Sequence, residues 1–319
     1  MSLEEQIPEL SLVIPTYNEE DSLAKLVDEI YDALNSFRFE ILFVNDGSTD
    51  NTLNVLKGVQ TKYNDNTNEL KIVNLRRNSG QTAAMRAGFQ LARGKYTVTL
   101  DSDGQNDPSD IVRLYNKLKS ENVDVVCGWR KNRHDPLSKR IPSKLSNFLH
   151  RRLTGLKIND SGCTLRIYDT KAVRNLPIHG EDHRFLPAII YSRGFSVTEL
   201  EVNHRPRIDG QSKYGFSRLF RGYFDLISTA FVYKIGVKPF QFFAKIALFP
   251  FILGTLILSY LTYAKFGMGQ DIGERPLLLL GVLLEIFAIQ FFLSGLIAEV
   301  LSTHNSVNFK QYSIKEVLE

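Results

Sequence analysis

The chain has 319 residues, of which 43% are apolar and 23% charged, and its formal net charge is +4. It is long enough for one large domain or two ordinary ones with a substantial core. Its two cysteines give no reason to expect a disulfide framework or a zinc site, and they fit a reducing compartment. The small net charge gives no indication of a nucleic-acid partner.

The first 130 residues alternate two kinds of segment. Short apolar runs predict strands over 10–15, 39–44, 70–75, 95–100 and 123–128. Between them, apolar residues at helical spacing predict helices over 20–37, after Asp50, over 80–92 and from Pro108 onward. Regular alternation of strands and helices indicates an α/β fold with a mostly parallel, doubly wound sheet.

Three polar clusters follow predicted strands, at residues 16–19, 45–50 and 101–107. Ligands of such sheets bind at the carboxyl ends of the strands, so we expect the clusters to share one ligand-binding edge. The chain has neither a G-x-G-x-x-G dinucleotide fingerprint after its first strand nor a G-x-x-x-x-G-K-[ST] P-loop. A nucleotide at this edge would therefore bind through acids and a metal ion.

The third cluster holds the carboxylates that are best suited to a cation. Asp101 and Asp103 are one residue apart, so on an extended turn both can reach one divalent ion, and Gln105 could add a carbonyl oxygen. Hard oxygen ligands fit Mg²⁺ or Mn²⁺, which substrate phosphates usually complete. Asp107 and Asp110 are interpreted instead as acids at the start of the following helix.

After residue 129 the regular alternation ends. The basic segment 130–153 is interpreted either as a solvated surface or as a surface that faces an acceptor near a membrane. Further strands are predicted over 163–168 and 195–202, with a helix around 181–194 between them. Aromatic and aliphatic residues at helical spacing, with arginines between them, predict an amphipathic interfacial helix over 216–231.

Two apolar stretches near the C-terminus, 242–263 and 277–300, are each long enough to cross a hydrocarbon core of about 30 Å. The short connection between them predicts a transmembrane hairpin, and a pair of buried core helices is the alternative. Lysines and arginines gather before the first stretch, which predicts that the N-terminal region is cytoplasmic. Glu285 is expected to face protein or another polar partner, because it lies within the second stretch.

Four motifs of the first half resemble the nucleotide-sugar-binding half of glycosyltransferase family 2, which has the GT-A fold. They occur in order as VIPTYNEE, VNDGSTD, LRRNSGQTAAMRAG and DSDGQNDP. In the second half, DSGCTLRIYDTKAV, GEDHRFLP and RIDGQSKYGFSRL precede the predicted hairpin. They are similar to polyprenyl-phosphate glycosyltransferases, which include dolichyl-phosphate mannose synthases and undecaprenyl-phosphate glucosyl- and aminoarabinosyltransferases. The run D-x-G-C-x-L-R-x-Y looks closest to the aminoarabinose type.

The resemblance implies roles for the matching residues. The nucleotide-sugar would contact Pro15, Tyr17, Glu19, Asp46, Gly80, Asp101, Ser102 and Asp103. The metal ion would contact Asp101, Asp103 and Gln105, and phosphate groups of donor or acceptor would contact Arg130, Arg207, Ser212 and Lys213. Catalytic roles fall on Asp103, Asp160, Glu181 and Asp182. Among these, Asp160 is the first candidate for orienting the acceptor or taking a residual proton. The alternatives are a turn aspartate for Asp160 and helix-start capping for the acidic pair.

The implied activity is metal-dependent, inverting transfer of a sugar from a nucleotide-sugar, with UDP favoured, to undecaprenyl or dolichyl phosphate. The second pKa of a phosphate monoester is about 6, so the acceptor is mostly a dianion near neutral pH and a general base is helpful at most. Alternatives are a GDP-mannose-dependent polyprenyl-phosphate mannose synthase and a catalytically inert membrane scaffold. A processive polysaccharide synthase is disfavoured, because the chain lacks a Q-x-x-R-W motif.

The expected organisation is a GT-A catalytic domain over 1–215, juxtamembrane helices over 216–240, two transmembrane helices over 241–302 and a cytoplasmic tail over 303–319. The protein is expected to be integral to a bacterial inner or plasma membrane, with a cytoplasmic catalytic domain. The resemblance further implies a homotetramer formed through the membrane region.

Overall fold

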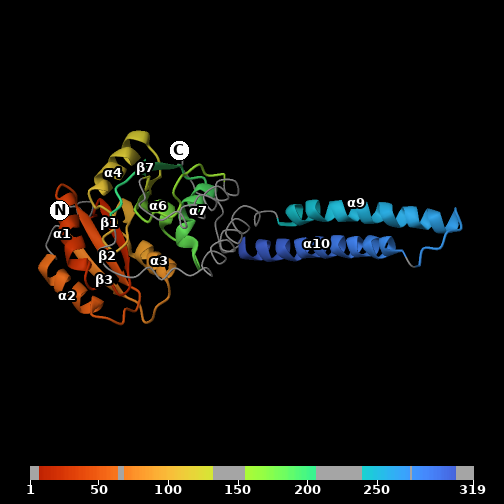
Figure 1. Cartoon of the computed structure of the whole chain (residues 1–319). Coiled ribbons are helices and arrows are strands. Elements are labelled where there is room, and N and C mark those ends of the chain that lie inside the picture. The colour runs from red at the N-terminus through yellow and green to blue at the C-terminus, as the bar shows by residue number, and fades with distance from the viewer. Residues whose placement is uncertain (1–6, 64–67, 132–154, 206–238, 274, 307–319) are drawn as a thin grey trace. The chain divides into compact units, whose positions relative to one another are not determined.

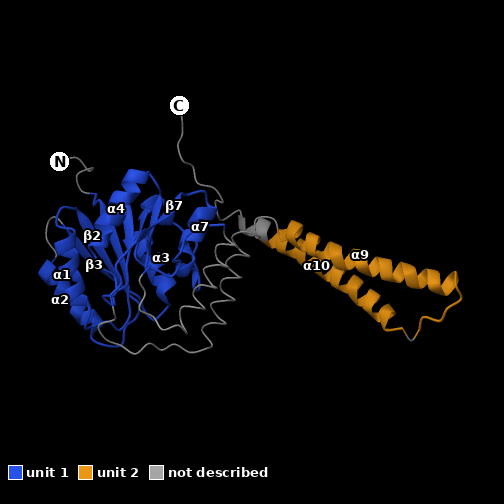
Figure 2. Cartoon of the chain, turned by 45° about the horizontal axis from the view of Figure 1, so that its top comes forward, with its two compact units in different colours: residues 1–229, 312–319 blue, residues 230–311 orange. Residues whose placement is uncertain are grey.

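The computed structural model describes residues 7–63, 68–131, 155–205, 239–273 and 275–306 (Figure 1). The chain divides into two compact units, residues 1–229 with 312–319 and residues 230–311 (Figure 2). The first unit contains a β-sheet with helices packed on it, and the second contains two long apolar helices. The predicted juxtamembrane helices over 216–240 lie almost entirely outside the described residues.

Seven strands form one mixed sheet in the order β3-β2-β1-β4-β6-β5-β7. Their bounds are β1 Leu10–Thr16, β2 Phe39–Asn45, β3 Glu69–Asn74, β4 Tyr96–Thr99, β5 Val125–Trp129, β6 Arg166–Asp169 and β7 Val197–Glu201. Every neighbouring pair is parallel except the two pairs of β6, which runs antiparallel to β4 and β5. The predicted α/β fold with a mostly parallel sheet is confirmed, with one reversed strand.

The helices of the first unit are α1 Leu23–Ala33, α2 Thr52–Tyr63, α3 Gln81–Leu91, α4 Asp110–Glu121, α6 Thr170–Val173, the 3₁₀-helix η2 Asp182–Arg184, and α7 Leu186–Ser192. The helix predicted over 20–37 is shorter at both ends, and the helix predicted around 181–194 is divided into η2 and α7. All seven residues of β1 and of β2 are buried, as expected for central parallel strands covered on both faces.

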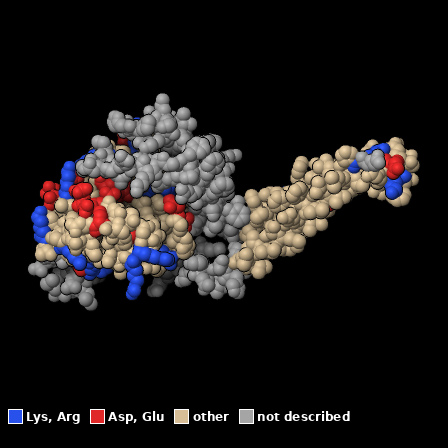
Figure 3. Space-filling model, turned by 60° about the horizontal axis from the view of Figure 1, so that its bottom comes forward, with Lys and Arg blue, Asp and Glu red and all other residues tan. Residues whose placement is uncertain are grey.

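The second unit is a hairpin of α9 Pro239–Phe266 and α10 Pro276–Ser306. Both helices are long and apolar enough to cross a membrane, and only 17% and 11% of their most apolar windows are buried within the chain. The face of the hairpin seen in Figure 3 is almost without charge except at its tip. Lys265, Asp271 and Arg275 lie at the end of α9 or in the connection to α10. Core helices of a soluble domain would be mostly buried, so this pattern indicates association with a membrane.

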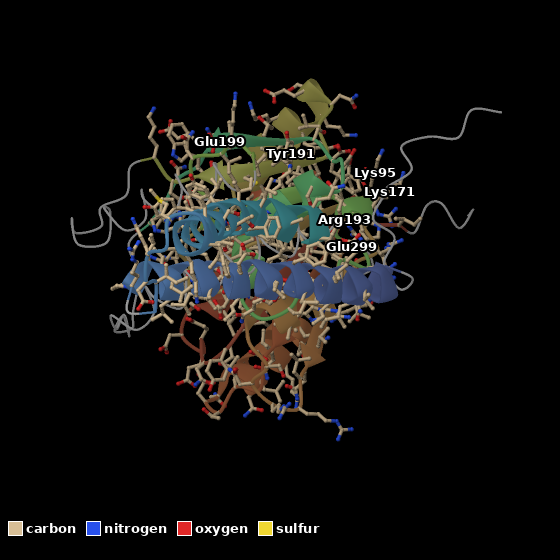
Figure 4. The ribbon with its side chains drawn as sticks, turned by 90° about the vertical axis from the view of Figure 1, so that its right-hand side faces the viewer. Lys95, Lys171, Tyr191, Arg193, Glu199 and Glu299 are labelled. Atoms are coloured by element: carbon tan, nitrogen blue, oxygen red, sulfur yellow. The ribbon has the colours of Figure 1, made fainter. Side chains whose placement is uncertain are left out.

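Polar contacts join the two hairpin helices. Glu285 of α10 accepts a hydrogen bond from the Thr255 hydroxyl of α9 at 2.8 Å, so this acid has a polar partner on the neighbouring helix. Glu299, labelled on α10 in Figure 4, accepts a hydrogen bond from the backbone N–H of Phe240 at 3.1 Å. That N–H belongs to the first turn of α9 and has no partner within its own helix, so Glu299 caps α9.

Candidate functional site

The three polar clusters meet at the carboxyl ends of β1, β2 and β4, as their sequence positions predict. The Ser102 hydroxyl donates to the carbonyl oxygen of Pro15 at 3.1 Å, and the Ser22 hydroxyl donates to the carbonyl oxygen of Ser102 at 2.6 Å. The Asn18 side chain accepts from the backbone N–H of Thr49 at 2.9 Å. These contacts tie the loops after β1, β2 and β4 into one surface.

Among the residues expected at the nucleotide, Asp46 and Gly80 are in direct contact. The Asp46 carboxylate is 4% exposed and accepts from the backbone N–H groups of Ser79 at 2.7 Å and Gly80 at 2.8 Å. Gly80 has φ +91° immediately before α3, a conformation that favours glycine. Asp46 therefore orders the loop that leads into α3.

The other residues expected at the nucleotide lie on the loops after β1 and β4. Tyr17 is 43% exposed, and Pro15 and Ser102 are joined by the hydrogen bond described above. Glu19 donates its backbone N–H to the Thr52 hydroxyl at 3.0 Å. Tyr17 thus offers an accessible ring at this edge, whereas Pro15 and Ser102 connect β1 to the β4 loop.

Asp101 is held by two neutral donors that come from distant parts of the chain. Its Oδ1 accepts from Nε2 of Gln81 at 2.9 Å, and its Oδ2 accepts from the Thr164 hydroxyl at 2.7 Å. Gln81 begins α3, and Thr164 precedes β6. Both residues belong to motifs quoted above, but nothing in the sequence pairs them with Asp101, so sequence reasoning gave them no role.

Asp103 and Gln105 lie on a tight turn at Gly104, which has φ +72°. Oδ1 of Asp103 accepts from the backbone N–H of Gln105 at 3.1 Å, and Nε2 of Gln105 donates to the carbonyl oxygen of Arg205 at 3.4 Å. Among the described residues, no three His, Cys, Asp or Glu side chains gather as a metal site. Two carboxylates and one amide oxygen on such a turn fit a hard cation that substrate phosphates would complete.

Arg130 and Asp160, expected to have separate roles, form a buried ion pair with side chains 13% and 6% exposed. Nε of Arg130 donates to Oδ2 of Asp160 at 2.7 Å, and Nη2 donates to Oδ1 at 3.0 Å. Burial lowers the pKa of the Arg130 guanidinium, but the hydrogen bonds and charge of Asp160 outweigh this and raise it, and the charge of Asp101 adds to the rise. Arg130 therefore carries its charge close to the Asp101 turn.

The acidic pair of the second half makes local contacts. Glu181 pairs with Arg184 at 3.1 Å, and Asp182 accepts from the backbone N–H of His179 at 2.9 Å. It is His183 that reaches across to α3, where its Nδ1 lies 2.8 Å from the Thr82 hydroxyl. Sequence reasoning missed His183, because only a tertiary contact distinguishes it from its charged neighbours.

Asp107 and Asp110 serve the start of α4, as expected. Asp107 accepts from the backbone N–H and hydroxyl of Ser109 at 3.0 and 2.7 Å, and it pairs with Arg205 at 3.1 Å. Burial raises the pKa of Asp107, but the hydrogen bonds from Ser109 and the charge of Arg205 outweigh this effect and lower it. Asp110 pairs with Arg113 and accepts from the backbone N–H of Asn203 at 2.7 Å.

Three residues expected at phosphate groups, Arg207, Ser212 and Lys213, lie outside the described residues. The described edge thus combines an acidic turn, a fixed arginine and an ordered loop before α3. These groups lie at the carboxyl ends of parallel strands, where α/β sheets bind their ligands.

A model of glycosyl transferase family 2 matches residues 11–176, which are just over half of the chain. The chain belongs to this family. It is 43% identical over 300 residues to the dodecaprenyl-phosphate galacturonate synthase of Rhizobium johnstonii, across 92% of this chain and 88% of that protein. It is 36% identical over 295 residues to an undecaprenyl-phosphate 4-deoxy-4-formamido-L-arabinose transferase of Pseudomonas syringae, across 92% of this chain and 85% of that protein.

The fold is shared with a solved structure, glucosyl-3-phosphoglycerate synthase from Mycobacterium tuberculosis in complex with Mn²⁺, uridine diphosphate and phosphoglyceric acid. The TM-score is 0.56 at 16% identity, and the match covers 71% of this chain and 78% of that chain. The predicted GT-A fold and the similarity to polyprenyl-phosphate glycosyltransferases are thereby confirmed.

Proposed function

We propose that the protein transfers a sugar, with inversion, from a UDP-sugar to the phosphate of a membrane polyprenyl phosphate. The names of the relatives support the acceptor, since both describe undecaprenyl- or dodecaprenyl-phosphate sugars. The Asp101–Asp103 turn, with the charge of Arg130 close by, is the observation that carries the proposal. It supports the proposal because two carboxylates and a fixed guanidinium lie at the carboxyl ends of the strands, the edge at which such sheets bind ligands.

In this proposal, Asp101, Asp103 and Gln105 hold Mg²⁺ or Mn²⁺ with the donor diphosphate. A solved structure of the same fold that contains Mn²⁺ and uridine diphosphate supports a metal ion in this role. The metal ion, when bound, stabilises the negative charge of the departing nucleoside diphosphate. Asp103 stays a predicted catalytic residue, because its carboxylate would hold that metal ion.

The remaining site residues divide between the two substrates. The nucleotide-sugar is assigned to Pro15, Tyr17, Glu19, Asp46, Gly80 and Ser102. Phosphate groups are assigned to Arg130, Arg207, Ser212 and Lys213, because guanidinium groups bind phosphate through paired N–H donors and lysine supplies a point charge. Glu181 and Asp182 stay predicted catalytic residues at the acceptor side.

The acceptor needs little activation by the protein. Its phosphate is largely a dianion near neutral pH, because the second pKa of a phosphate monoester is about 6. The protein must align the attacking oxygen with the anomeric carbon and reduce the repulsion between two anionic substrates. Fixed cations near the diphosphate supply that screening.

We further propose that α9 and α10 cross a bacterial inner or plasma membrane and that the catalytic domain is cytoplasmic. The apolar, exposed surfaces of both helices and the basic residues before α9 support this orientation. The homotetramer stays a prediction, and the mass of the detergent-solubilised protein tests it.

One experiment tests the function. The full chain in nanodiscs is incubated with undecaprenyl phosphate, Mn²⁺ and separate UDP- and GDP-sugars, including uronic acid and pentose donors, and the lipid products are identified by mass. Transfer from a UDP-sugar supports the proposal, and transfer from GDP-mannose alone supports a mannose synthase. Absence of transfer from every donor supports an inert scaffold.

A further inference from the structure

The ion pair of Arg130 and Asp160 leaves the carboxylate with little capacity to accept a proton. Its Oδ2 accepts from Nε and, at 3.3 Å, from the backbone N–H of Arg130. Its Oδ1 accepts from Nη2 of Arg130 and, at 3.1 Å, from the backbone N–H of Gly162. A carboxylate has about four lone-pair positions, and these four donors match that number.

Arg130, by contrast, keeps donors for a ligand. Nε and Nη2 bond to Asp160, while Nη1 has no hydrogen-bond partner among the described residues. A guanidinium has five N–H donors in a fixed fork, and that fork matches two phosphate oxygens. The pair thus fixes one edge of the guanidinium and leaves further N–H groups available.

The segment that carries Asp160 is itself fixed on both sides. Before it, the backbone N–H of Asn159 donates to Glu199 of β7, labelled in Figure 4, at 2.7 Å. After it, the carbonyl oxygen of Ser161 accepts from Nη2 of buried Arg166 at 2.7 Å. A Cβ at Gly162 would lie 3.2 Å from Nη2 of Arg130, so glycine leaves room for the guanidinium.

The same segment reaches the acidic turn. Thr164, four residues after Asp160, donates to Asp101 at 2.7 Å, and its carbonyl oxygen accepts from the Thr99 hydroxyl of β4 at 2.6 Å. One short segment, residues 160–164, therefore fixes the Arg130 guanidinium through Asp160 and the Asp101 carboxylate through Thr164.

We propose that Asp160 is a positioning residue, which holds the Arg130 guanidinium against a substrate phosphate, and that it does not take a proton from the acceptor. This inference rests on the proposed function. The phosphate belongs either to the donor diphosphate or to the polyprenyl phosphate. Both sources present the same chemistry to the guanidinium.

Kinetics of Asp160→Asn, Arg130→Gln and the double variant test the proposal. We expect each single variant to lower kcat/KM at least tenfold. The loss should come mainly from a higher KM, and for the same substrate in both variants. The double variant should be no less active than the less active of the two single variants. Residues that act as one unit are non-additive in this way. Additive losses, or a KM unchanged in Asp160→Asn with only kcat reduced, would overturn the proposal.

The pH profile and chemical rescue separate positioning from proton transfer. Asp160→Asn should keep the acid limb near the second phosphate pKa of about 6, because that limb belongs to the acceptor. Guanidinium ion should restore Arg130→Ala at least fivefold, but should fail to restore Arg130→Ala/Asp160→Asn. Loss of the acid limb in Asp160→Asn, or equal rescue of both proteins, would assign Asp160 to proton transfer or to a structural role.

Folding and the proposed function are checked separately. Calorimetry of UDP–Mn²⁺ and of a short polyprenyl phosphate in detergent needs no turnover, and both single variants should weaken the same ligand by the same factor. That result supports the pairing of Arg130 with Asp160 even if the wild type transfers no sugar. Absence of transfer by the wild type would contradict only the proposed function. Weakening of different ligands by the two variants, or of the same ligand by clearly different factors, would overturn the pairing.

Glu201→Gln is the matched control for these variants. Glu201 forms an exposed ion pair, at 3.1 Å, with Lys131, the residue that follows Arg130 in the chain. The variant removes the negative charge of this pair and should keep wild-type kinetics. Arg130→Lys and Asp160→Glu serve where a charge-removing variant fails to fold. Each should fold and still raise the same KM, because neither recreates the paired geometry.

Discussion

The hydroxyl of Thr164 donates to Oδ2 of Asp101 across 2.7 Å, although the two residues are 63 positions apart in the chain. This bond joins the segment before β6 to the acidic turn after β4. With the Gln81 amide on the other oxygen, it orients the Asp101 carboxylate before any ligand arrives.

Thr164→Val should lower the apparent affinity for Mn²⁺ by about tenfold, since partners that orient a metal-binding carboxylate typically affect affinity or activity by roughly 10–100-fold. The measurement is activity as a function of Mn²⁺ concentration at saturating donor. Thr164→Ser keeps the hydroxyl and should behave like the wild type. An equal loss in both variants would assign the effect to packing.

Metal removal should abolish transfer. Excess EDTA should reduce the rate to background, and added Mn²⁺ or Mg²⁺ should restore it. Asp103→Asn should lower kcat/KM about a hundredfold, by analogy with the loss of one fixed group that stabilises transition-state charge. Asp107→Asn, in the same loop after β4 but bonded to Ser109 and Arg205, should stay within about threefold of the wild type. Full activity in EDTA would remove the metal from the mechanism.

Gly47→Ala should destabilise the sheet unit. Gly47 has φ +67°, and an added Cβ would lie 2.6 Å from the backbone carbonyl carbon of Arg77, so strain and a clash coincide. We expect a loss of about 1–3 kcal/mol in the free energy of unfolding, measured by chemical denaturation. Gly58→Ala, where nothing lies within 4 Å of the new atom in the interior of α2, should instead stabilise by about 0.5–1 kcal/mol.

Cys127 and Cys163 should resist alkylation in the folded protein. Burial raises the pKa of the Cys127 thiol to about 12 and that of Cys163 to about 11. Only the thiolate is nucleophilic, so both should be unreactive toward iodoacetamide at pH 8 and should react once the chain is unfolded in detergent. Mass spectrometry of the labelled protein measures this.

The same thiols predict how stability depends on pH. Their folded-state pKa values lie above the unfolded value of about 8.5, so the stability they contribute is complete below that value and is lost as pH rises toward 11–12. The denaturant concentration at the midpoint of unfolding should therefore decrease as the pH is raised above about 9. The change should be smaller in a Cys127→Ser/Cys163→Ser protein, because its hydroxyls do not titrate there.

Thr255→Val should weaken the hairpin. Its hydroxyl donates to Oε1 of Glu285 at 2.8 Å, and interhelical hydrogen bonds in membranes contribute roughly 0.6–2 kcal/mol. Thermal unfolding in detergent should show a loss of about that size. Thr255→Ser should retain the wild-type value, since serine preserves the donor. A stable Thr255→Val protein would mean that the bond contributes nothing measurable.

The sequence by itself determined where most strands and helices lie and which polar clusters share one edge of the sheet. Apolar runs locate the buried strands, and helical spacing locates α1 to α4, because burial on one or both faces imposes a period on the chain. Two long apolar stretches predict the hairpin from length alone. The parallel topology then requires the clusters after β1, β2 and β4 to share an edge.

Only the tertiary structure decided which polar groups meet. Three of these contacts join residues 30 or more positions apart. They are the antiparallel pairing of β6, the ion pair of Arg130 with Asp160, and the hydrogen bond from Thr164 to Asp101. Periodicity records whether a side chain is buried, but a hydrogen bond also depends on strand order, register and turn geometry, which residues elsewhere in the chain set. In the sequence, Asp160 is an acid with no partner nearby, and the fold brings it to Arg130.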